Sequence, residues 1–409
     1  MPEVALVIPS YWSRPRPEVW RPGDAVYDHP TPLDAEGTLR RTLESLQVLP
    51  RRDFRLVVLA VPTSDEIAAA VERRVEAIVR EAAVRLAVPW SVFGPSQLAR
   101  VHAELERRGL GHLKDLLRLR GYANVRNLCV FVPHVLGADT AVLIDDDEVF
   151  EDPDFMDKAL EAVGRTLGGE PVYAVAGYYR QPDGGFLVPE PAEAWARAWG
   201  QVEAMNRAFK AYIGRPPRYK VTPFAFGGNL VLHRALFTRV PFDPGVPRGE
   251  DIDYVINARI FGFKVFLDRT LAIRHRPPPK THPAWRRLRE DVLRFVYERE
   301  KIRGQTGLPG TVRVRAEDFD PYPGAFLKDD LELGAERAAR ALAEAYRRQG
   351  DPEGAREVLR TLELMHAALD DPGDPFSDLV RLQRRWTELM RALSRPELRR
   401  GLARALAGA

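Results

Sequence analysis

The sequence predicts an α/β fold in which a mainly parallel sheet is covered by helices on both faces, followed by a mostly helical C-terminal region. Apolar segments of strand length alternate with amphipathic segments of helix length through most of the 409 residues. The expected strands are apolar nearly throughout, as in a parallel sheet buried on both faces. Helical patterns with short Pro and Gly breaks follow from about residue 301. We therefore expect an α/β domain at residues 1–280 and a helical region at residues 281–409.

The first half of the α/β domain is expected to supply four strands of the sheet. The strands are expected at 4–9, 54–61, 90–93 and 140–144, and the helices at 36–47, 65–86 and 123–136. A Pro-rich insertion, residues 10–32, separates the first strand from the first helix. It is expected to be either a lid over a ligand or a well-packed surface loop, and we favour the loop.

The second half continues the alternation and then becomes helical. Strands are expected at 171–179, within 224–233, at 264–268 and at 271–275, and helices at 153–167, 191–212, 251–261, 329–348, 352–369 and 375–393. The segment 181–186, "QPDGGF", is expected to form a tight turn. The basic segment that follows residue 275 is expected to be a solvated helix with Glu/Arg pairs.

Composition excludes several classes of protein. A hydrophobic content of 45% and a charged content of 29% are typical of a soluble globular protein. A net charge of +3 gives no global field that would indicate a nucleic-acid partner. The single cysteine, Cys129, excludes an intramolecular disulfide framework and a thiolate metal cluster.

The location and the partners of the chain are expected from its segments. No signal peptide or transmembrane segment is visible, so we expect a cytoplasmic protein. The last helix, "RPELRRGLARALAGA", is basic and amphipathic, which fits either peripheral membrane contact or packing on another helix. The sequence leaves open whether the chain forms a homo-oligomer. The excess of Arg over Lys and the 34 prolines fit a thermophilic or high-GC source.

Three consecutive aspartates, Asp145, Asp146 and Asp147, end the strand "TAVLI". Carboxylates this close repel one another unless a cation neutralises them, and Mg²⁺ and Mn²⁺ prefer oxygen ligands. The carboxyl ends of strands are also where α/β sheets bind ligands. The triplet therefore indicates a divalent-metal site, and the plainer alternative is a solvated acidic turn.

Two further segments carry groups that suit a nucleotide. The first strand ends in "VIPSYW", where Pro9, Ser10 and Tyr11 would meet a base and ribose at the sheet edge, or simply end the strand. Arg126 lies in the helix that leads to the aspartates. Its guanidinium would donate strong hydrogen bonds to phosphates, or else form a structural salt bridge.

Two late segments carry acid–base and metal-binding groups. Glu250 and Asp251 open a helix, where the helix dipole favours acids. One of them could also act as a general base toward a hydroxyl group. His275 follows a strand and is a fair ligand for Mn²⁺ or Mg²⁺ beside carboxylates, although a lone histidine is more often structural.

The order of these motifs resembles a known family. The chain contains "VIPSY", "VRN", "DDD", "FGGN", "GEDID" and "IRH" in that order. This series is similar to glycosyltransferases of the GT-A fold, closest to the inverting enzymes of glycosyltransferase family 2, over residues 1–280. The resemblance implies a Rossmann-like sheet and a nucleotide-sugar donor.

The resemblance also implies residue roles on the donor side. Asp145 and Asp147 match the D-x-D pair, with Asp147 binding the metal directly and Asp145 holding the ribose or a metal-bound water. Asp146 could replace either one. His275 would be the late metal ligand, and the cofactor would be Mn²⁺ or Mg²⁺.

On the acceptor side, the resemblance implies that Asp251 is the general base and that Glu250 orients it or contacts the acceptor. Gly227, Gly228 and Asn229 would border the acceptor, because glycines let a ligand approach the backbone. The chain departs from the family pattern at residues 61–63, where an acidic turn is usual.

The sequence therefore predicts a metal-dependent enzyme that moves a hexosyl group from a nucleotide sugar to a hydroxyl acceptor, with inversion. Three alternatives stay open. They are a retaining GT-A enzyme of the kind that makes glucosyl- or mannosylglycerate, a nucleotidyltransferase, and a non-catalytic scaffold. A nucleotidyltransferase would usually show a Gly-rich first loop, which is absent here.

Overall fold

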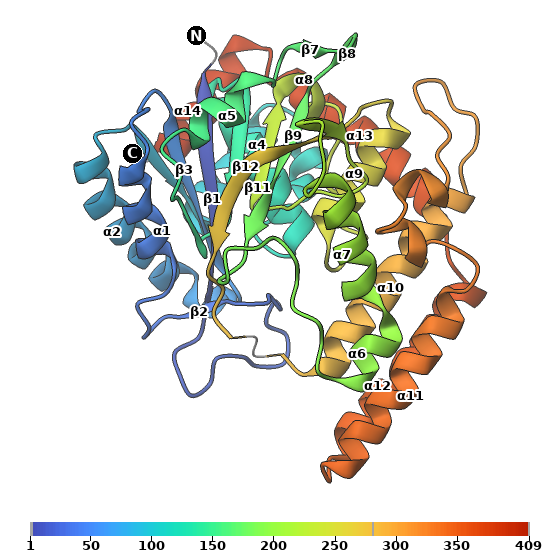
Figure 1. The fold of residues 1–409 in the computed structure, drawn as a ribbon. Helices are drawn as coiled ribbons and strands as arrows, with labels where there is room; N and C mark the ends of the chain where they lie inside the picture. The colour runs from blue at the N-terminus through green and yellow to red at the C-terminus, as the bar shows by residue number, and fades with distance from the viewer. Residues whose placement is uncertain (1–2, 280–281, 408–409) are drawn as a thin grey trace.

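The fold is a large mixed sheet with helices on both faces and a helical region along one side (Figure 1). This computed structural model describes residues 3–279 and 282–407. The main sheet has the order β10-β12-β9-β11-β5-β1-β3-β4, with β2 pairing with β1 and β6 with β12. Its strands are β1 (Val4–Ser13), β2 (Thr31–Pro32), β3 (Arg55–Pro62), β4 (Trp90–Phe93), β5 (Thr140–Ile144), β6 (Glu148–Val149), β9 (Ala174–Arg180), β10 (Tyr219–Val221), β11 (Asn229–His233) and β12 (Phe266–His275). The strands β7 (Thr166–Leu167) and β8 (Glu170–Pro171) form a separate pair.

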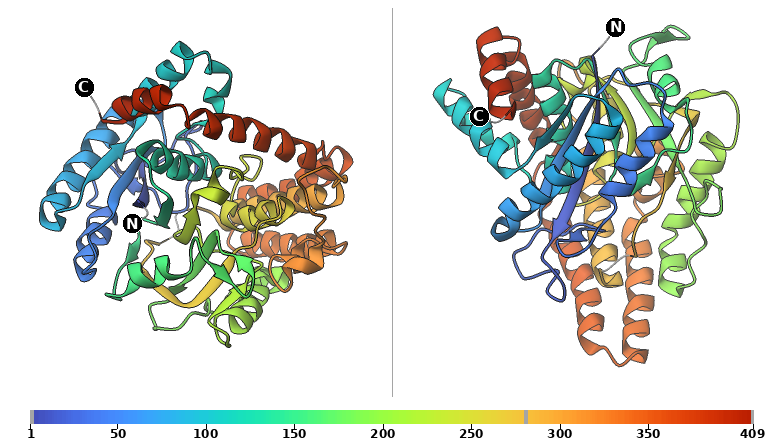
Figure 2. Two further views of the ribbon diagram at one scale, coloured as in Figure 1. Left: turned by 90° about the horizontal axis from the view of Figure 1, so that it is seen from above. Right: turned by 90° about the vertical axis from the view of Figure 1, so that its left-hand side faces the viewer.

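Helices cover both faces of the sheet (Figure 2). The α-helices are α1 (Leu39–Ser45), α2 (Ala68–Leu86), α3 (Pro95–Arg107), α4 (Tyr122–Leu136), α5 (Phe155–Glu161), α6 (Ala194–Trp199), α7 (Gln201–Tyr212), α8 (Arg234–Phe237), α9 (Glu250–Ile260), α10 (Ala284–Arg303), α11 (Leu331–Arg348), α12 (Pro352–Asp370), α13 (Pro375–Ala392) and α14 (Pro396–Ala407). Alternate residues of β1 enter two apolar cores, Val7 on the face that α4 covers and Leu6 on the face of α1 and α2. The predicted fold class is therefore confirmed.

The sheet topology brings the strand ends of interest to one edge. Strands β5, β1, β3 and β4 are parallel, so their carboxyl ends meet. Strand β11 runs antiparallel between β5 and β9, which places its first residues at that same edge. Strand β12 runs parallel to β9 and ends there too. This shared end is called the carboxyl edge below.

Several elements differ from the prediction. Strand β1 continues to Ser13 because Tyr11 and Trp12 still pair with β3. Helix α3 was not predicted, although its Pro at the first turn and its amphipathic pattern are helix signals. The helix expected at 191–212 is two helices, because Gly200 adopts a left-handed conformation with φ of 75°. The two strands expected at 264–275 are one strand with a register shift.

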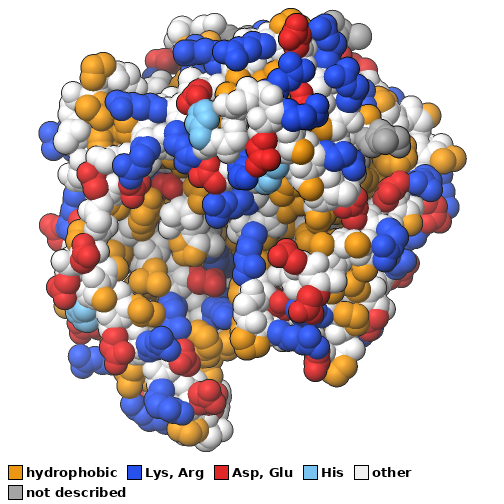
Figure 3. All heavy atoms as spheres, turned by 180° about the vertical axis from the view of Figure 1, so that it is seen from behind, with side chains coloured by type: hydrophobic (Ala, Val, Ile, Leu, Met, Phe, Trp, Pro, Cys, Tyr) orange, Lys and Arg blue, Asp and Glu red, His pale blue; other side chains and the backbone are white. Residues whose placement is uncertain are grey.

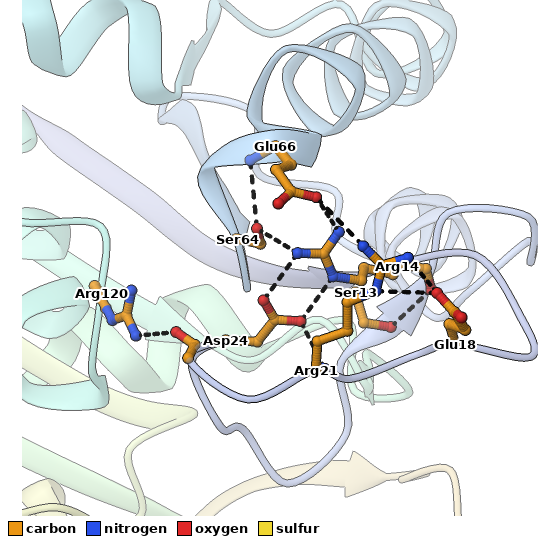
Figure 4. Close-up of polar contacts among 9 residues, drawn as sticks. Ser13, Arg14, Glu18, Arg21, Asp24, Ser64, Glu66 and Arg120 are labelled. Atoms are coloured by element: carbon orange, nitrogen blue, oxygen red, sulfur yellow. Dashed lines mark hydrogen bonds and ion pairs between the residues drawn. The ribbon is translucent and has the colours of Figure 1, made fainter.

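The Pro-rich insertion is a packed loop held by Arg14 (Figure 4). The Arg14 guanidinium donates to Asp24 at 2.9 Å, to Ser64 at 2.9 Å and to Glu66 at 2.5 Å. The N–H of Ala25 donates to the carbonyl of Thr63 at 2.8 Å, which ties the loop to the end of β3. The loop therefore lies on the carboxyl edge.

The C-terminal helices pack on one another and on the α/β part. Helix α10 contacts α12 and α13, while α11 and α12 form a hairpin that projects from the body (Figure 1). The apolar side of α14 packs on α3 and α4, with Leu398 and Leu402 buried. No helix among residues 3–279 and 282–407 is long and apolar enough to cross a bilayer.

Helix α10 corrects the expectation of a solvated helix. Its residues Arg294, Glu298 and Lys301 are buried. Lys301 Nζ lies 2.6 Å from Asp253 Oδ1 and 2.8 Å from Asp243 Oδ2. These charges join α10 to α9, the helix that begins with Glu250. A pattern of alternating charges alone does not show whether the charged face meets water or a second set of charges.

Candidate functional site

The three aspartates lie at the carboxyl edge beside the end of β1. Ser10 Oγ donates to Asp146 Oδ2 at 2.6 Å, and Trp12 Nε1 donates to Ser10 Oγ at 2.9 Å. Thr42 Oγ1 donates to the carbonyl of Asp146 at 2.7 Å. Burial, aided by the charge of Asp147, raises the pKa of Asp146 to about 8. The middle aspartate thus anchors the triplet to β1, while Pro9 pairs with β3 and is buried.

Arg126 joins the aspartate triplet to the start of α9. Its Nη2 lies 2.8 Å from Asp145 Oδ1, and its Nε lies 3.1 Å from Glu250 Oε1. Only 4% of Arg126 is exposed, so the guanidinium lies beneath the two acids. Burial raises the pKa of Glu250 to about 7, although Arg126 opposes that rise. Arg126 therefore forms internal ion pairs, as expected under the alternative in which it makes a structural salt bridge.

Asp147 and His275 approach each other across the pairing of β6 with β12. Asp147 Oδ2 lies 3.4 Å from His275 Nε2, and 12% and 24% of the two side chains are exposed. His275 faces Glu148 in the register, and the N–H of Arg276 donates to the carbonyl of Asp147 at 2.9 Å. The two predicted metal ligands are thus brought together by backbone pairing.

This pair fits two coordination positions of a divalent ion. Ligand atoms at right angles around an ion with bonds of about 2.1 Å lie about 3.0 Å apart, so a separation of 3.4 Å between Asp147 and His275 requires a small adjustment. Within the described ranges, no three His, Cys, Asp or Glu side chains converge into a ready metal site. The remaining ligands of an ion would come from water or a substrate, as Mg²⁺ commonly arranges.

The two-glycine segment lies between the triplet and Asp251. The N–H of Gly227 donates to Asp251 Oδ2 at 2.9 Å. A Cβ atom on Gly227 would lie 2.6 Å from Arg126 Nη2, and one on Gly228 would lie 2.3 Å from Glu148 Oε1. Only glycine therefore allows this backbone to approach both groups.

Asn229, which the sequence predicts to border the acceptor, lies inside the sheet. Its side chain is fully buried. Its Nδ2 donates to the carbonyls of Tyr178 at 3.2 Å and Leu271 at 3.1 Å. Asn229 thus fastens β11 to β9 and β12, and it positions the two glycines that precede it.

Tyr11 packs against the insertion. Its ring centroid lies 4.3 Å from that of Tyr27 and 5.5 Å from that of Tyr122. Tyr27 is 1% exposed, and its hydroxyl accepts the N–H of Gly121 at 3.0 Å. The ring face expected to meet a nucleotide base is therefore partly covered by the protein itself.

The insertion also reaches across to the other side of the carboxyl edge. Asp28 Oδ2 lies 2.9 Å from Arg248 Nη2, and His282 Nε2 lies 2.6 Å from the carbonyl of Tyr27. The guanidinium of Arg286 in α10 lies 5.3 Å from the ring of Trp20. On the face drawn in Figure 3, the surface is hollowed near its middle, and Lys and Arg side chains gather around the hollow.

A cavity of about 270 Å³ lies at the ends of β3 and β4. Its lining includes Thr63, Leu98, His102, Leu119 and Arg120. The hydroxyl of Thr63 is buried and has no hydrogen-bond partner in the described part of the chain. The cavity occupies the place where the family pattern would put an acidic turn.

Two residues of the site were not predicted from the sequence. Glu148 is fully buried, and its Oε2 accepts the N–H of Asp145 at 3.0 Å. Burial raises the pKa of Glu148 well above its ordinary value. Tyr179, near the end of β9, accepts the N–H of Gly228 at 2.9 Å and stacks on His275 with a centroid distance of 4.7 Å. The strand end at 179 was visible in the sequence, but its neighbours in the sheet were not.

A family model described as glycosyltransferase like family 2 matches residues 31–298. The chain belongs to this family. The match covers five of the six motifs of this glycosyltransferase, from "VRN" to "IRH", and β1 lies before it. The predicted family and the predicted class of enzyme are confirmed. No curated protein matches the glycosyltransferase significantly.

Three solved structures are similar to this glycosyltransferase at low sequence identity. The mannosyltransferase PcManGT from Pyrobaculum calidifontis, in complex with GDP-Man and Mn²⁺, is 17% identical with a TM-score of 0.44, covering 98% of this chain and 86% of that one. A mycobacterial protein is 15% identical with a TM-score of 0.38, covering 73% and 74%. GalNAc-T7 with UDP, GalNAc and Mn²⁺ is 12% identical with a TM-score of 0.35, covering 83% and 55%.

Proposed function

We propose that this glycosyltransferase is a metal-dependent, inverting hexosyltransferase that uses a nucleotide-sugar donor and a hydroxyl acceptor. The observation that supports it best is the approach of Asp147 and His275 to 3.4 Å at the carboxyl edge. Asp251 joins the same edge through its hydrogen bond with Gly227. The proposed metal ligands and the proposed general base would thus act from one edge of the sheet.

Asp147 and His275 would hold Mn²⁺ or Mg²⁺. The ion, when bound, would supply a Lewis acid beside the departing nucleoside diphosphate. Asp145, with 27% of its side chain exposed, would hold the ribose or a water on the ion. Asp146 would fix the geometry of the triplet through Ser10 instead of contacting the donor.

The donor nucleoside would extend from the aspartates along the ends of β1 and β3. The cavity beside Thr63 has aliphatic walls and polar groups, which suit a flat heterocycle. This placement agrees with the packing of Tyr11 against Tyr27, because the base would lie beyond these rings and not between them. The identities of the nucleotide base and of the sugar stay open.

Asp251 would accept the proton of the acceptor hydroxyl. The Gly227 N–H holds Asp251 Oδ2, and the N–H of Ile252 holds Oδ1 at 2.9 Å, so the orientation of the carboxylate is fixed. An ionised carboxylate held in this way can act as a general base toward a hydroxyl group. Glu250, bound to Arg126, would orient this turn of α9.

Three variants test this function. Nucleotide sugars with Mn²⁺ should raise the thermal unfolding temperature of the wild type, because a ligand of the native state stabilises it. Asp147→Ala should remove the part of the shift that depends on Mn²⁺. Asp251→Asn should keep the shift and lose transfer, whereas Asp378→Asn, which changes an exposed pair with Arg381 on α13, should keep both. Equal transfer by the wild type and Asp147→Ala would contradict the metal assignment.

The products decide among the related activities. If the enzyme inverts, NMR should show that the anomeric carbon of the transferred sugar has opposite configurations in the donor and in the product. Retention would identify the retaining alternative, and release of pyrophosphate would identify a nucleotidyltransferase. If no nucleotide sugar shifts the unfolding temperature with or without Mn²⁺, the result would favour the non-catalytic scaffold.

A further inference from the structure

We propose that Tyr179 is a positioning residue that couples the metal-binding pair, Asp147 and His275, to the acceptor-side segment Gly227–Gly228. The inference rests on the proposed function, because it assumes an ion at the pair and an acceptor at the glycines. Strand β9 lies between β11 and β12 in the sheet. Tyr179 therefore stands between the strand that begins after the glycines and the strand that ends in His275.

The ring of Tyr179 fixes the imidazole of His275. Their centroids are 4.7 Å apart and their planes differ by 26°, which is a stacked arrangement. Phe226 lies 4.7 Å from the ring of Tyr179 and limits its movement. Because the stacked ring sets the plane of the imidazole, it sets the direction of Nε2 toward Asp147.

The hydroxyl of Tyr179 fixes the glycine segment. It accepts the N–H of Gly228 at 2.9 Å, while the preceding N–H, of Gly227, donates to Asp251 Oδ2 at 2.9 Å. Two consecutive amides are therefore aimed at the tyrosine and at the general base. One side chain thus contacts the metal side with its ring, and its hydroxyl contacts the acceptor-side amide of Gly228 and the carboxyl group of Glu148.

The glycine segment has no free space in which a shift of Tyr179 could be absorbed. A Cβ atom on Gly228 would lie 2.3 Å from Glu148 Oε1 and 2.6 Å from Asp145 Oδ2. Both acids also lie within two residues of Asp147 in sequence. A movement of His275 on binding an ion would therefore be transmitted through Tyr179 to the amides that border the acceptor.

The experiment separates the ring from the hydroxyl and uses Mn²⁺ alone as the probe. Tyr179→Phe keeps the ring, and Tyr179→Leu removes both groups. Electron paramagnetic resonance measures the Mn²⁺ affinity. Hydrogen exchange measures how fast the backbone amides of peptide 224–231 exchange with solvent. Tyr178→Phe is the matched control, because its neighbouring ring packs on Phe186 and only its backbone carbonyl binds Asn229.

In the wild type, Mn²⁺ should slow exchange in peptide 224–231. Tyr179→Phe should bind Mn²⁺ within about twofold of the wild type, yet show faster exchange and no slowing by Mn²⁺. Tyr179→Leu should bind Mn²⁺ about tenfold more weakly, as for other groups that orient a metal ligand. Tyr178→Phe should behave as the wild type in both measurements.

Asp147→Asn distinguishes failure of this inference from failure of the proposed function. If Asp147→Asn binds Mn²⁺ as well as the wild type, the metal site itself is misplaced. If Asp147→Asn weakens Mn²⁺ binding but Tyr179→Phe leaves exchange and its response to Mn²⁺ unchanged, the coupling role of Tyr179 is refuted and the metal site stands. Should Tyr179→Leu fail to fold, the Tyr179→Phe measurements decide alone.

Discussion

Arg126 Nε lies 3.1 Å from Glu250 Oε1, and this contact joins the helix before the aspartates to the helix that carries the proposed base. The same guanidinium reaches Asp145 with its Nη2. One buried cation thus compensates two acids that come from two separate motifs. The separate motifs "VRN", "DDD" and "GEDID" meet at this one side chain.

Removal of this cation should destabilise the protein strongly. Arg126→Met leaves Asp145 and Glu250 without their counter-charge, and breaking a buried pair costs about 3–5 kcal/mol. Urea unfolding should show a loss of free energy in this range. Arg80→Met is the control, because it removes an exposed pair with Glu76 that contributes about 0.5 kcal/mol. Similar losses in both variants would show that the Arg126 network is not stabilising.

Glu298 should make the protein less stable as the pH rises. Burial raises its pKa to about 8 from an ordinary value of 4.5; Arg294 and Lys301 oppose the rise and Asp253 adds to it. Between these two pKa values the native state binds the proton that the unfolded state has lost. The contribution of Glu298 to the free energy of unfolding is therefore most favourable below about pH 4.5, and it is lost as the pH rises toward 8.

Glu298→Gln removes this titration and provides the test. Its free energy of unfolding should improve relative to the wild type between pH 5 and pH 8.5, measured by urea titration at both values. Glu344 on α11 is exposed. The difference in free energy of unfolding between Glu344→Gln and the wild type should therefore be the same at both pH values. A constant difference between Glu298→Gln and the wild type would mean that Glu298 keeps the same charge in both states.

The approach of Gly228 to Glu148 predicts a strict requirement for glycine. The added methyl of Gly228→Ala would lie 2.3 Å from Glu148 Oε1, so the segment must shift. Such overpacking costs about 1–3 kcal/mol and would displace the amides near Asp251. Thermal unfolding and transferase assays should both show losses. Gly307→Ala, which has no atom within 4 Å of the added carbon, should show neither.

The insertion should become accessible when its anchor is removed. Arg14→Ala deletes the contacts with Asp24, Ser64 and Glu66. We expect chymotrypsin to cut at Trp20 several times faster than in the wild type, as detected by mass spectrometry. Arg16→Ala is the control, because the pair of Arg16 with Asp34 is exposed. Equal cleavage in both variants would show that the Arg14 cluster does not hold the loop.

The order of strand ends made the site visible in the sequence. Because parallel strands end at one edge, the positions of Ser10 and Asp146 at two strand ends are enough to predict that both lie at that edge. The pairing of β6 with β12, which brings His275 to Asp147, could not be read from local patterns. It depends on contacts between residues more than one hundred positions apart, such as His275 and Glu148.

The surroundings of two features could not be read from the sequence, for one physical reason. The charges of α10 looked solvated because a sequence pattern shows which residues are charged but not what faces them. Tyr11 looked available to a ligand because the path of the insertion, which places Tyr27 on its ring, follows from non-local hydrogen bonds. Local propensity predicted the elements, and tertiary contacts decided which side chains stayed accessible.

The ion pairs of Lys301 determine how short a working protein can be. A chain cut after residue 280 would retain Asp243 and Asp253 but lose the ammonium group that neutralises them. Two buried carboxylates would then repel each other beneath the first turns of α9. Truncated proteins that keep every sequence motif should therefore be inactive, and attempts to transplant the catalytic half onto another scaffold must carry α10 with it.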